Sequence, residues 1–361
     1  MNQDSYRKRL QKTRELMEEQ GVDIFFVSPS PNLRYLSGYS LHGDERLFLL
    51  VLPVRGEPFA LVNALYRAQA EIMPVREFIP WSDGEDPVSI LKEEIAKRAI
   101  PAGKAALDPS LPALFSVPLS RAFPETEFML GSPLTNPQRQ YKDDAELDLI
   151  RRASALADRI LGDLISRGDY WIGKAERDFA EDLAAQMRRA GFKTCDSVVA
   201  VGANAAVPHH VTGDAAIQRG KGLLIDFWGS FEGYFTDCSR TFFIGEPDAE
   251  FKKVHGIVLE AHLAAEATAR PGNLLEDVDA AARTVIEGYG YGRYFTHRTG
   301  HGLGMEDHEG APVAPGEKTP VKPGMVFSIE PGIYLPGKLG VRIENLVAIG
   351  ERGPEILHHY P

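Results

Sequence analysis

Hydrophobic and polar positions alternate with two different periods along the first third of the chain. Residues 6–20 carry apolar side chains at helical spacing among charges, and Gly21 follows as a stop signal. Residues 86–98 repeat this spacing behind the helix-start pair Asp86-Pro87. Apolar runs of strand length lie at 24–27, 47–52, 59–62, 105–107 and 127–130, and one more helical stretch lies at 113–122. This alternation predicts an α/β layer fold for the N-terminal region.

The pattern changes after residue 131. The segment from Gly131 to Pro137 is rich in turn-forming residues, and a strongly helical pattern begins at Asp143. Helical patterns then lie at 143–167, 176–190, 249–269 and 274–289, and strand-like runs lie at 198–201, 222–228, 234–244, 325–329 and 341–348. Helices grouped with antiparallel-looking strands predict an α+β fold here. We therefore expect two domains, residues 1–132 and residues 133–361.

Composition narrows the class of protein. A chain of 361 residues is too long for one ordinary core. The net charge of −11, with no long basic run, argues against a nucleic-acid partner. The two cysteines, Cys195 and Cys238, are too few for a disulfide framework and indicate reduced thiols. The polar N-terminal segment lacks a signal-peptide core, and no run approaches the ~18 apolar residues of a membrane span, so we expect a cytoplasmic protein without a membrane partner.

Five side chains of metal-ligand type lie in the second half of the chain. They are Asp226 in LLIDFWG, Asp237 in YFTDCSRT, His301 in RTGHGLGM, Glu330 in FSIEPGIY and Glu344 in GVRIENLV. The carboxylates interrupt apolar or strand-like runs, where an unpaired charge is costly unless it binds a partner or a metal. Four carboxylates and one imidazole carry too much negative charge for one divalent ion. The set therefore suits two ions that share bridging oxygens.

The first two carboxylates fall on a predicted β-hairpin. Asp226 and Asp237 are eleven residues apart, with Gly229 and Gly233 between them. An odd separation does not by itself place both side chains on one face, so the turn or a bulge has to do so.

Taken singly, these residues also have ordinary structural explanations. Asp237 is compatible with a surface acid beside a turn, and a histidine between glycines, as at 301, is more often structural than a ligand. A buried strand glutamate at 344 is explained by an ion pair with Arg342. The occurrence of all five in this order is what favours a metal site.

The motifs together resemble the pita-bread metallopeptidase family, which includes methionine aminopeptidase, aminopeptidase P and prolidase (Xaa-Pro dipeptidase). The likeness covers the whole chain. The segment Asn32-Leu-Arg-Tyr-Leu-Ser-Gly38 is similar to a motif in the N-terminal domain of the aminopeptidase P, prolidase and creatinase branch. The resemblance implies a creatinase-type α/β N-terminal domain followed by a pita-bread catalytic domain.

The resemblance also implies a role for each motif residue. Asp226 resembles the ligand of one ion alone, Asp237 and Glu344 resemble the carboxylates that bridge both ions, and His301 and Glu330 resemble ligands of the second ion. Mostly oxygen ligands with one imidazole favour Mn²⁺, with Co²⁺ and Zn²⁺ as the alternatives.

Three residues are expected to act in catalysis. His209 in AVPHH and His308 in MEDHEG match family histidines that contact the substrate or stabilise the tetrahedral intermediate. Glu330 is expected to accept a proton from the water between the ions, and the implied reaction is attack of a metal-bridging hydroxide on the carbonyl preceding proline. His210 and His297 are weaker candidates, for which a solvated neighbour and a packing residue are the simpler explanations.

One position departs from the family pattern. Many prolidases carry an arginine shortly after the second histidine, where it binds the free carboxylate of a dipeptide, but this chain has Pro312 there. A bidentate arginine is the natural partner of a planar carboxylate. Lys338, Arg34 or His42 are the candidates to replace it.

The predicted function is that of an Xaa-Pro dipeptidase acting on proline-containing peptides, with an Xaa-Pro aminopeptidase acting on longer peptides as the alternative. Two more distant alternatives are a metal-free creatinase-like hydrolase and a non-catalytic binding protein, and both predict a degraded ligand set. Relatives that carry the N-terminal domain are commonly dimers, so the resemblance also implies a homodimer.

Overall fold

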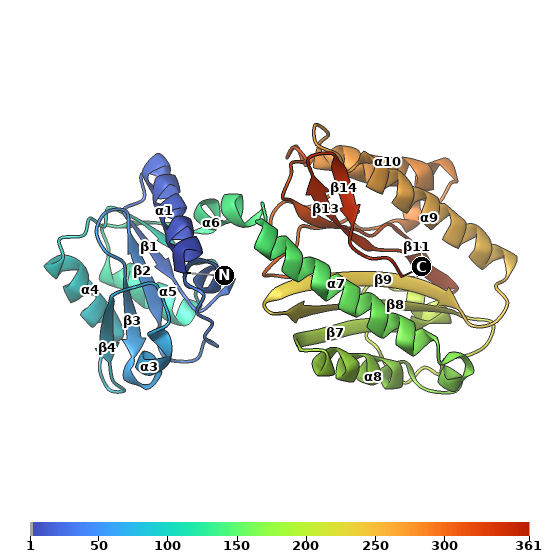
Figure 1. The fold of residues 1–361 in the computed structure, drawn as a ribbon, viewed down its shortest axis with the longest axis horizontal. Coiled ribbons are helices and arrows are strands. Elements are labelled where there is room, and N and C mark those ends of the chain that lie inside the picture. The colour runs from blue at the N-terminus through green and yellow to red at the C-terminus, as the bar shows by residue number, and fades with distance from the viewer. Residues whose placement is uncertain (1–2, 361) are drawn as a thin grey trace. The chain divides into compact units, whose positions relative to one another are not determined.

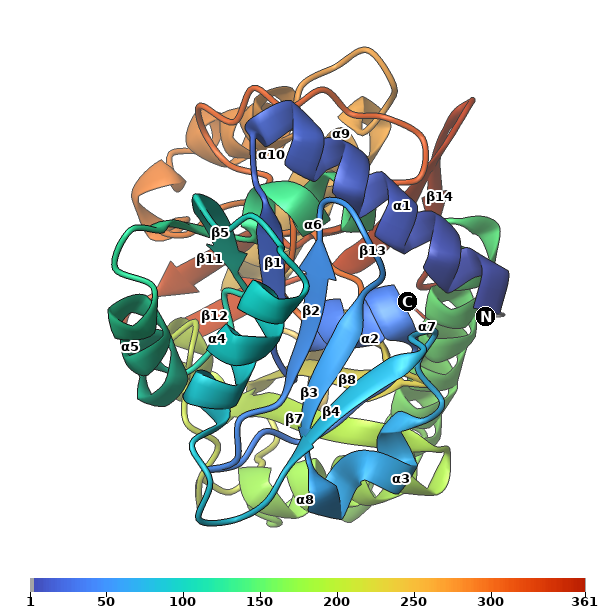
Figure 2. The ribbon, with the colours of Figure 1, turned by 90° about the vertical axis from the view of Figure 1, so that its left-hand side faces the viewer.

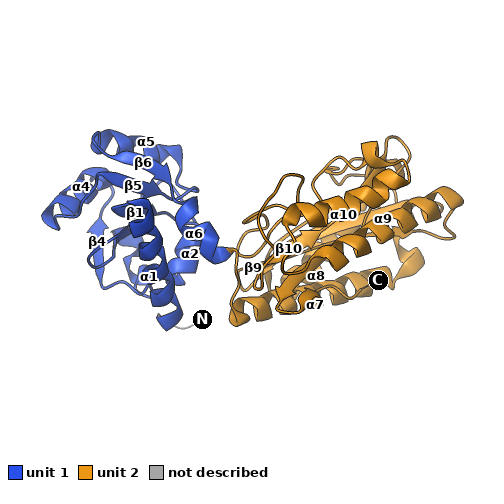
Figure 3. Ribbon diagram, turned by 90° about the horizontal axis from the view of Figure 1, so that it is seen from above, with its two compact units in different colours: residues 1–139 blue, residues 140–361 orange. Residues whose placement is uncertain are grey.

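The computed structural model describes residues 3–360 and divides the chain into two compact units, residues 1–139 and 140–361 (Figure 3). The sequence placed the boundary after residue 132, a few residues earlier. The difference is α6 (Ser132–Arg139), a helix in the segment that was interpreted as turns. Pro133 lies in the first helical turn, where its missing N–H is not needed, and the next two residues are buried. A proline-containing segment was therefore still able to form a helix.

Unit 1 alternates helices and strands, which confirms the α/β prediction. Its elements are α1 (Gln3–Gln20), β1 (Ile24–Val27), α2 (Pro31–Ser37), β2 (Leu49–Pro53), β3 (Phe59–Asn63), η1 (Ala64–Tyr66), α3 (Arg67–Ala70), β4 (Glu77–Trp81), α4 (Pro87–Lys97), β5 (Lys104–Leu107), α5 (Ala113–Ala122), β6 (Glu127–Leu130) and α6. The strands form one mixed sheet in the order β4-β3-β2-β1-β5-β6. Figure 2 shows β1 to β4 side by side in this sheet. Leu91 and Ile95 of α4 and Leu119 of α5 pack in one hydrophobic cluster with β1, β2 and β3.

The sequence missed α2, α3 and β4. Strand β4 contains Pro80, which lacks a backbone N–H for a ladder and made the segment a poor candidate for a strand. The sheet order explains why it is tolerated, because β4 is an edge strand that pairs only with β3.

Unit 2 contains the remaining elements. They are α7 (Asp144–Ile165), η2 (Gly168–Trp171), α8 (Glu176–Arg189), β7 (Phe192–Val201), η3 (Gly202–Ala206), β8 (Gly222–Phe231), β9 (Tyr234–Phe243), α9 (Ala249–Thr268), α10 (Leu275–Gly288), η4 (Gly292–Tyr294), β10 (Val326–Ile329), β11 (Gly332–Leu335), β12 (Leu339–Arg342), β13 (Asn345–Gly350) and β14 (Gly353–Ile356). The four long helices and the strands between them confirm the α+β prediction.

Two helix pairs cover two groups of strands in this unit (Figure 1). Helices α7 and α8 pack on the antiparallel sheet β7-β8-β9 in one hydrophobic cluster, which includes Leu161, Phe179 and Phe227. Helices α9 and α10 pack on β10 to β13 in a second cluster, which includes Val258, Val278 and Phe327. A smaller cluster, which includes Val198, Leu224 and Tyr334, joins strands of the two groups.

The predicted strand 341–348 is broken in the structure. Gly332 pairs with Arg342 in the β11–β12 ladder, whereas Ile329 pairs with Asn345 in the β10–β13 ladder. The chain therefore changes partner strands at Ile343 and Glu344. This leaves the Glu344 side chain out of regular sheet alternation, at the junction of two sheets. Within residues 3–360, no helix is both long enough and apolar enough to cross a membrane.

Candidate metal centre

The hairpin of β8 and β9 carries the first two predicted ligands. Asp226 lies opposite Ser239 and Asp237 lies opposite Trp228, with no register shift in the ladder. Phe231 and Tyr234 close the hairpin, and both residues between them, Glu232 and Gly233, have positive φ. Directly opposite residues in a two-residue hairpin have an odd separation, so the turn alone brings both carboxylates to one face. No bulge is required.

A cavity of about 210 Å³ in unit 2 collects all of the predicted site residues. It is lined by Val198, Pro208, His209, Asp226, Trp228, Asp237, His297, Arg298, His301, Asp307, His308, Glu330, Arg342 and Glu344. One ligand atom each from Asp237, His301 and Glu344 lies within 4.8 Å of the other two. Residues separated by more than 100 positions are therefore brought together as the motif order predicted.

His301 is held with one ring nitrogen available to the cavity. Its Nδ1 lies 3.3 Å from the Gly302 carbonyl, which can only accept, so Nδ1 carries the proton. Its Nε2 lies 3.7 Å from Asp237 Oδ2 and 3.5 Å from Glu330 Oε1. Burial lowers the pKa of His301 to about 3, so the ring is neutral near pH 7. A neutral imidazole with a free Nε2 is the form that binds a metal ion.

The backbone beside this histidine leaves no room for a side chain. A Cβ on Gly300 would lie 1.8 Å from the Ser328 carbonyl oxygen. The main chain before His301 can therefore approach β10 closely only because residue 300 is glycine. This is the physical reason for the glycine-flanked histidine in the sequence motif.

The carboxylates of the cavity are buried and poorly matched by donors. Burial raises the pKa of Asp237 and of Glu344, and it raises the pKa of Glu330 to about 7. Asp237 Oδ1 and Glu344 Oε1 are buried and have no hydrogen-bond partner among the described residues. Buried unpaired carboxylate oxygens are costly unless a cation occupies the space between them.

Asp226 is better satisfied than the other carboxylates. Its Oδ2 accepts from Arg342 Nη2 at 2.6 Å, and its Oδ1 accepts from Ser239 Oγ at 2.8 Å. Arg342 also donates to Tyr334 and to the Pro208 carbonyl, so its donors are used within the protein. The ion pair of Arg342 is therefore with Asp226.

Both predicted catalytic histidines line the cavity. The His308 ring lies 3.8 Å from the His301 ring, centroid to centroid, and His209 lies on the loop after η3. His210 is not a solvated neighbour, because its Nε2 lies 2.9 Å from Glu176 Oε2. The buried Glu176 also accepts from the Val201 and Gly213 main chain. These bonds fix the loop that carries His209.

His297 is a pocket residue as well as a packing residue. Its Nε2 contacts the Tyr334 hydroxyl at 2.8 Å, and its Nδ1 donates to the Arg298 carbonyl at 2.7 Å. Burial lowers the pKa of His297 to about 4, which keeps the ring uncharged.

Sequence reasoning missed two charged residues of the cavity, Arg298 and Asp307. Asp307 Oδ1 is buried without a partner among residues 3–360, and burial raises the pKa of this carboxyl to about 6. Arg298 Nη2 lies 3.3 Å from His308 Nδ1. Both stand within three residues of a predicted site histidine, a proximity that was available as a signal.

The fold and this ligand set define a two-domain metallopeptidase. Residues 148–351 match the description "Metallopeptidase family M24", and residues 9–141 match "Creatinase/Prolidase N-terminal domain". The chain belongs to metallopeptidase family M24, whose members use two metal ions. The family that the motifs resembled is thus confirmed.

Three relatives show how close the similarity is. A probable dipeptidase PepE of Mycobacterium bovis is 33% identical over 363 residues, covering 99% of this chain and 95% of that protein. A prolidase from Thermococcus sibiricus has a TM-score of 0.94 at 35% identity, covering 100% of this chain and 98% of that one. The dipeptidase PepE of Mycobacterium ulcerans has a TM-score of 0.92 at 33% identity, covering 100% and 97%.

Proposed function

We propose that this protein is an Xaa-Pro dipeptidase that depends on two divalent metal ions. The observation that carries the proposal is the cluster of Asp237, His301 and Glu344, with buried carboxylate oxygens that have no protein partner. The names of the similar dipeptidases and prolidases support the same substrate class. A creatinase-like or non-catalytic protein on this scaffold has no reason to keep such a set.

The residues present fit two ions. Asp237 and Glu344 each offer an unpartnered oxygen to bridge them, Asp226 would complete the first, and His301 and Glu330 would complete the second. Four carboxylates balance two dications, and oxygen-rich sites with one imidazole favour Mn²⁺ over a purely structural Zn²⁺. A bound pair of ions would supply an acidified water and polarise the scissile carbonyl.

The protein's own groups would orient the substrate and move protons. His209 and His308 line the cavity and would donate hydrogen bonds to the carbonyl oxygen as negative charge develops on it. Glu330 lies beside His301 and would accept the proton of the attacking water.

Arg298 is the best-placed group for the free carboxylate of a dipeptide. It lines the cavity, and among the described residues its guanidinium hydrogen-bonds to His308 alone, whereas Arg342 is engaged with Asp226. Lys338 does not line the cavity and pairs with Glu250 at 3.1 Å. We therefore assign to Arg298 the carboxylate-binding role of the family arginine, whose position is occupied by Pro312 in this chain.

The test compares substrates after the metal is exchanged. The protein is stripped with a chelator, reloaded with Mn²⁺, Co²⁺ or Zn²⁺, and assayed on an Xaa-Pro dipeptide and an Xaa-Pro-Xaa tripeptide. We expect Mn²⁺-dependent turnover with a clear preference for the dipeptide. Inactivity on both peptides under every metal would refute the proposal, and preference for the tripeptide would favour the aminopeptidase.

A pair of variants separates carboxylate binding from general damage. Arg298→Gln should raise KM for the dipeptide about tenfold or more, because a charge-assisted bond is lost, with a smaller effect on the tripeptide. Lys338→Gln is the matched control and should leave KM unchanged for both the dipeptide and the tripeptide. If KM for the dipeptide rises in Lys338→Gln but not in Arg298→Gln, Lys338 and not Arg298 binds the free carboxylate.

The homodimer remains a prediction of the family resemblance, and the cytoplasmic location remains a prediction from the polar N-terminal segment and the lack of long apolar runs. Sedimentation of the purified protein at micromolar concentration tests the first, and a single species of about 40 kDa would contradict it.

A further inference from the structure

Strand β9 has two different polar faces. Asp237 and Ser239 point to the metal cavity, and side chains alternate along a strand, so Thr236, Cys238 and Arg240 point to the opposite face. That opposite face meets α7 and the segment 357–360. Along β9, each residue of this opposite face is therefore adjacent in sequence to a residue of the cavity face.

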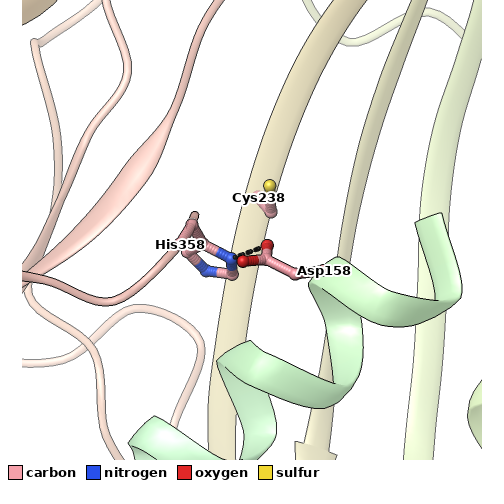
Figure 4. Close-up of side chains that lie close together, drawn as sticks. All are labelled: Asp158, Cys238 and His358. Atoms are coloured by element: carbon pink, nitrogen blue, oxygen red, sulfur yellow. Dashed lines mark hydrogen bonds and ion pairs between the residues drawn. The ribbon is translucent and has the colours of Figure 1, made fainter. Parts of the chain in front are cut away.

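The first part of this back face is centred on His358 (Figure 4). The imidazole is fully buried, and its Nδ1 donates to Asp158 Oδ1 of α7 at 2.8 Å. Its Nε2 lies 3.3 Å from Thr236 Oγ1, and the ring also interacts with the main chain of Asp237. The second oxygen of Asp158 accepts from the His359 backbone N–H at 2.5 Å. The 357–360 segment is thus tied to β9 beside a bridging ligand.

The second part is centred on Arg240, which is buried. Two of its N–H groups donate to the Tyr360 carbonyl, at 2.9 and 2.7 Å. Its Nη1 donates to the carbonyl of Glu344 at 2.5 Å, and its Nη2 donates to Asn345 Oδ1 at 2.9 Å. One guanidinium therefore joins β9, the 357–360 segment and the main chain of the other bridging ligand.

Asp158, Cys238 and His358 also have the residue types of a metal site. The contacts argue against this use. His358 and Asp158 satisfy each other, and Arg240 Nη1 lies 3.4 Å from Cys238 Sγ, where a cation would be repelled. The cluster is a polar anchor.

We propose that this back-face network, defined as Asp158, Thr236, Arg240, His358 and the Tyr360 carbonyl, positions Asp237 and Glu344 to share two metal ions. The proposal rests on the dinuclear site of the proposed function. Asp237 and Glu344 come from segments that belong to different sheets. On the cavity side their negative charges repel each other. Hydrogen bonds on the back face keep the two segments together when no cation offsets that repulsion.

The network is expected to act on metal affinity, as outer hydrogen bonds to metal ligands do in other sites. Arg240→Lys keeps the positive charge but cannot donate to Tyr360, Glu344 and Asn345 together. We expect it to weaken Mn²⁺ binding by about 10- to 100-fold, measured by equilibrium dialysis of the full-length protein with metal analysis.

His358→Ala tests the other half of the network, and His359→Ala is its control. The neighbouring His359 side chain is exposed, and the Asp158 bond uses only its backbone N–H. We expect a similar loss of Mn²⁺ affinity in His358→Ala and less than a twofold change in His359→Ala. If His358→Ala does not fold, Arg240→Lys decides the question.

A spectroscopic measurement separates positioning from general stability. The wild-type protein loaded with two Mn²⁺ ions should give the electron paramagnetic resonance signal of a spin-coupled pair, and Arg240→Lys should lose or alter it at saturating Mn²⁺. A variant that only lowers Tm, with unchanged Mn²⁺ affinity and an unchanged coupled signal, overturns the proposal. A wild-type protein that binds no Mn²⁺ overturns the proposed function as well.

Discussion

The two faces of strand β9 are both polar and buried, yet they are matched in opposite ways. On the cavity face, Asp237 Oδ1 and the nearby Glu344 Oε1 have no partner among the described residues. On the back face, His358 and Asp158 bond to each other, and Arg240 donates to four oxygen-bearing groups. Similar residue types thus form a candidate metal site on one face and a hydrogen-bonded anchor on the other.

The difference shows what identifies a ligand site in a protein interior. Burial, charge and clustering are common to both faces, so none of them distinguishes the two. The distinguishing feature is the shortage of donors on the cavity face, which a cation relieves. A change confined to one face should therefore show whether that face contributes to the chemistry or to the stability of the protein.

The largest effect is expected from Asp237→Asn. Removing one bridging charge should lower kcat by more than about 10³-fold, which is a larger loss than removal of a single oxyanion donor causes. It should also reduce the bound Mn²⁺ below two equivalents per chain. Peptidase assays and metal analysis measure both effects. Asp196→Asn, exposed on the neighbouring β7, is the control. Full turnover by Asp237→Asn would contradict the assigned ligand role.

His308→Ala should have the next largest effect. Loss of one donor to the developing oxyanion should lower kcat by roughly 10²- to 10³-fold while two Mn²⁺ ions stay bound. The same loss is expected for His209→Ala. Unchanged kcat with a raised KM would instead assign these histidines to ground-state binding of the peptide.

The cavity face should also respond to pH through metal binding. Burial raises the pKa of Glu330 to about 7 and that of Asp307 to about 6, so protons compete with cations at these carboxyls in the metal-free protein. His301, with its pKa lowered to about 3, stays neutral throughout. Mn²⁺ affinity should therefore fall, by about tenfold per unit for one proton, as the pH drops below about 7. Titration calorimetry in two buffers should show proton release on binding. A flat profile between pH 5 and pH 8 would mean that the carboxyls are already ionised.

The smallest effect on kcat at saturating Mn²⁺, together with a clear effect on stability, is expected from Asp158→Asn. The change weakens the charge-assisted bonds to His358 and to the main chain, which should lower the free energy of unfolding by about 1–3 kcal/mol. Chemical denaturation of the metal-free protein measures this, with exposed Asp163→Asn on the same helix as control. A stability equal to that of the control would show that the anchor contributes little.

Local patterns determined much of this protein in advance. The period of the apolar residues predicted most helices and strands, because amphipathic faces are read from neighbouring positions. The predicted ligands Asp226, Asp237, His301, Glu330 and Glu344 were singled out because each stands in a distinctive short motif, and all five line one cavity. The hairpin that carries Asp226 and Asp237 was predicted in the same way, because its turn depends on a few neighbouring residues.

Tertiary structure decided what no neighbouring residues encode. His358 meets Asp158 across 200 positions and Arg240 meets the Tyr360 carbonyl across 120, so neither contact leaves a periodic trace in the sequence. The break of the predicted strand at Glu344 arises because the chain changes partner strands there. Which buried charges remain unmatched depends on the full set of donors around them. That set exists only after the two sheets and their helices have packed.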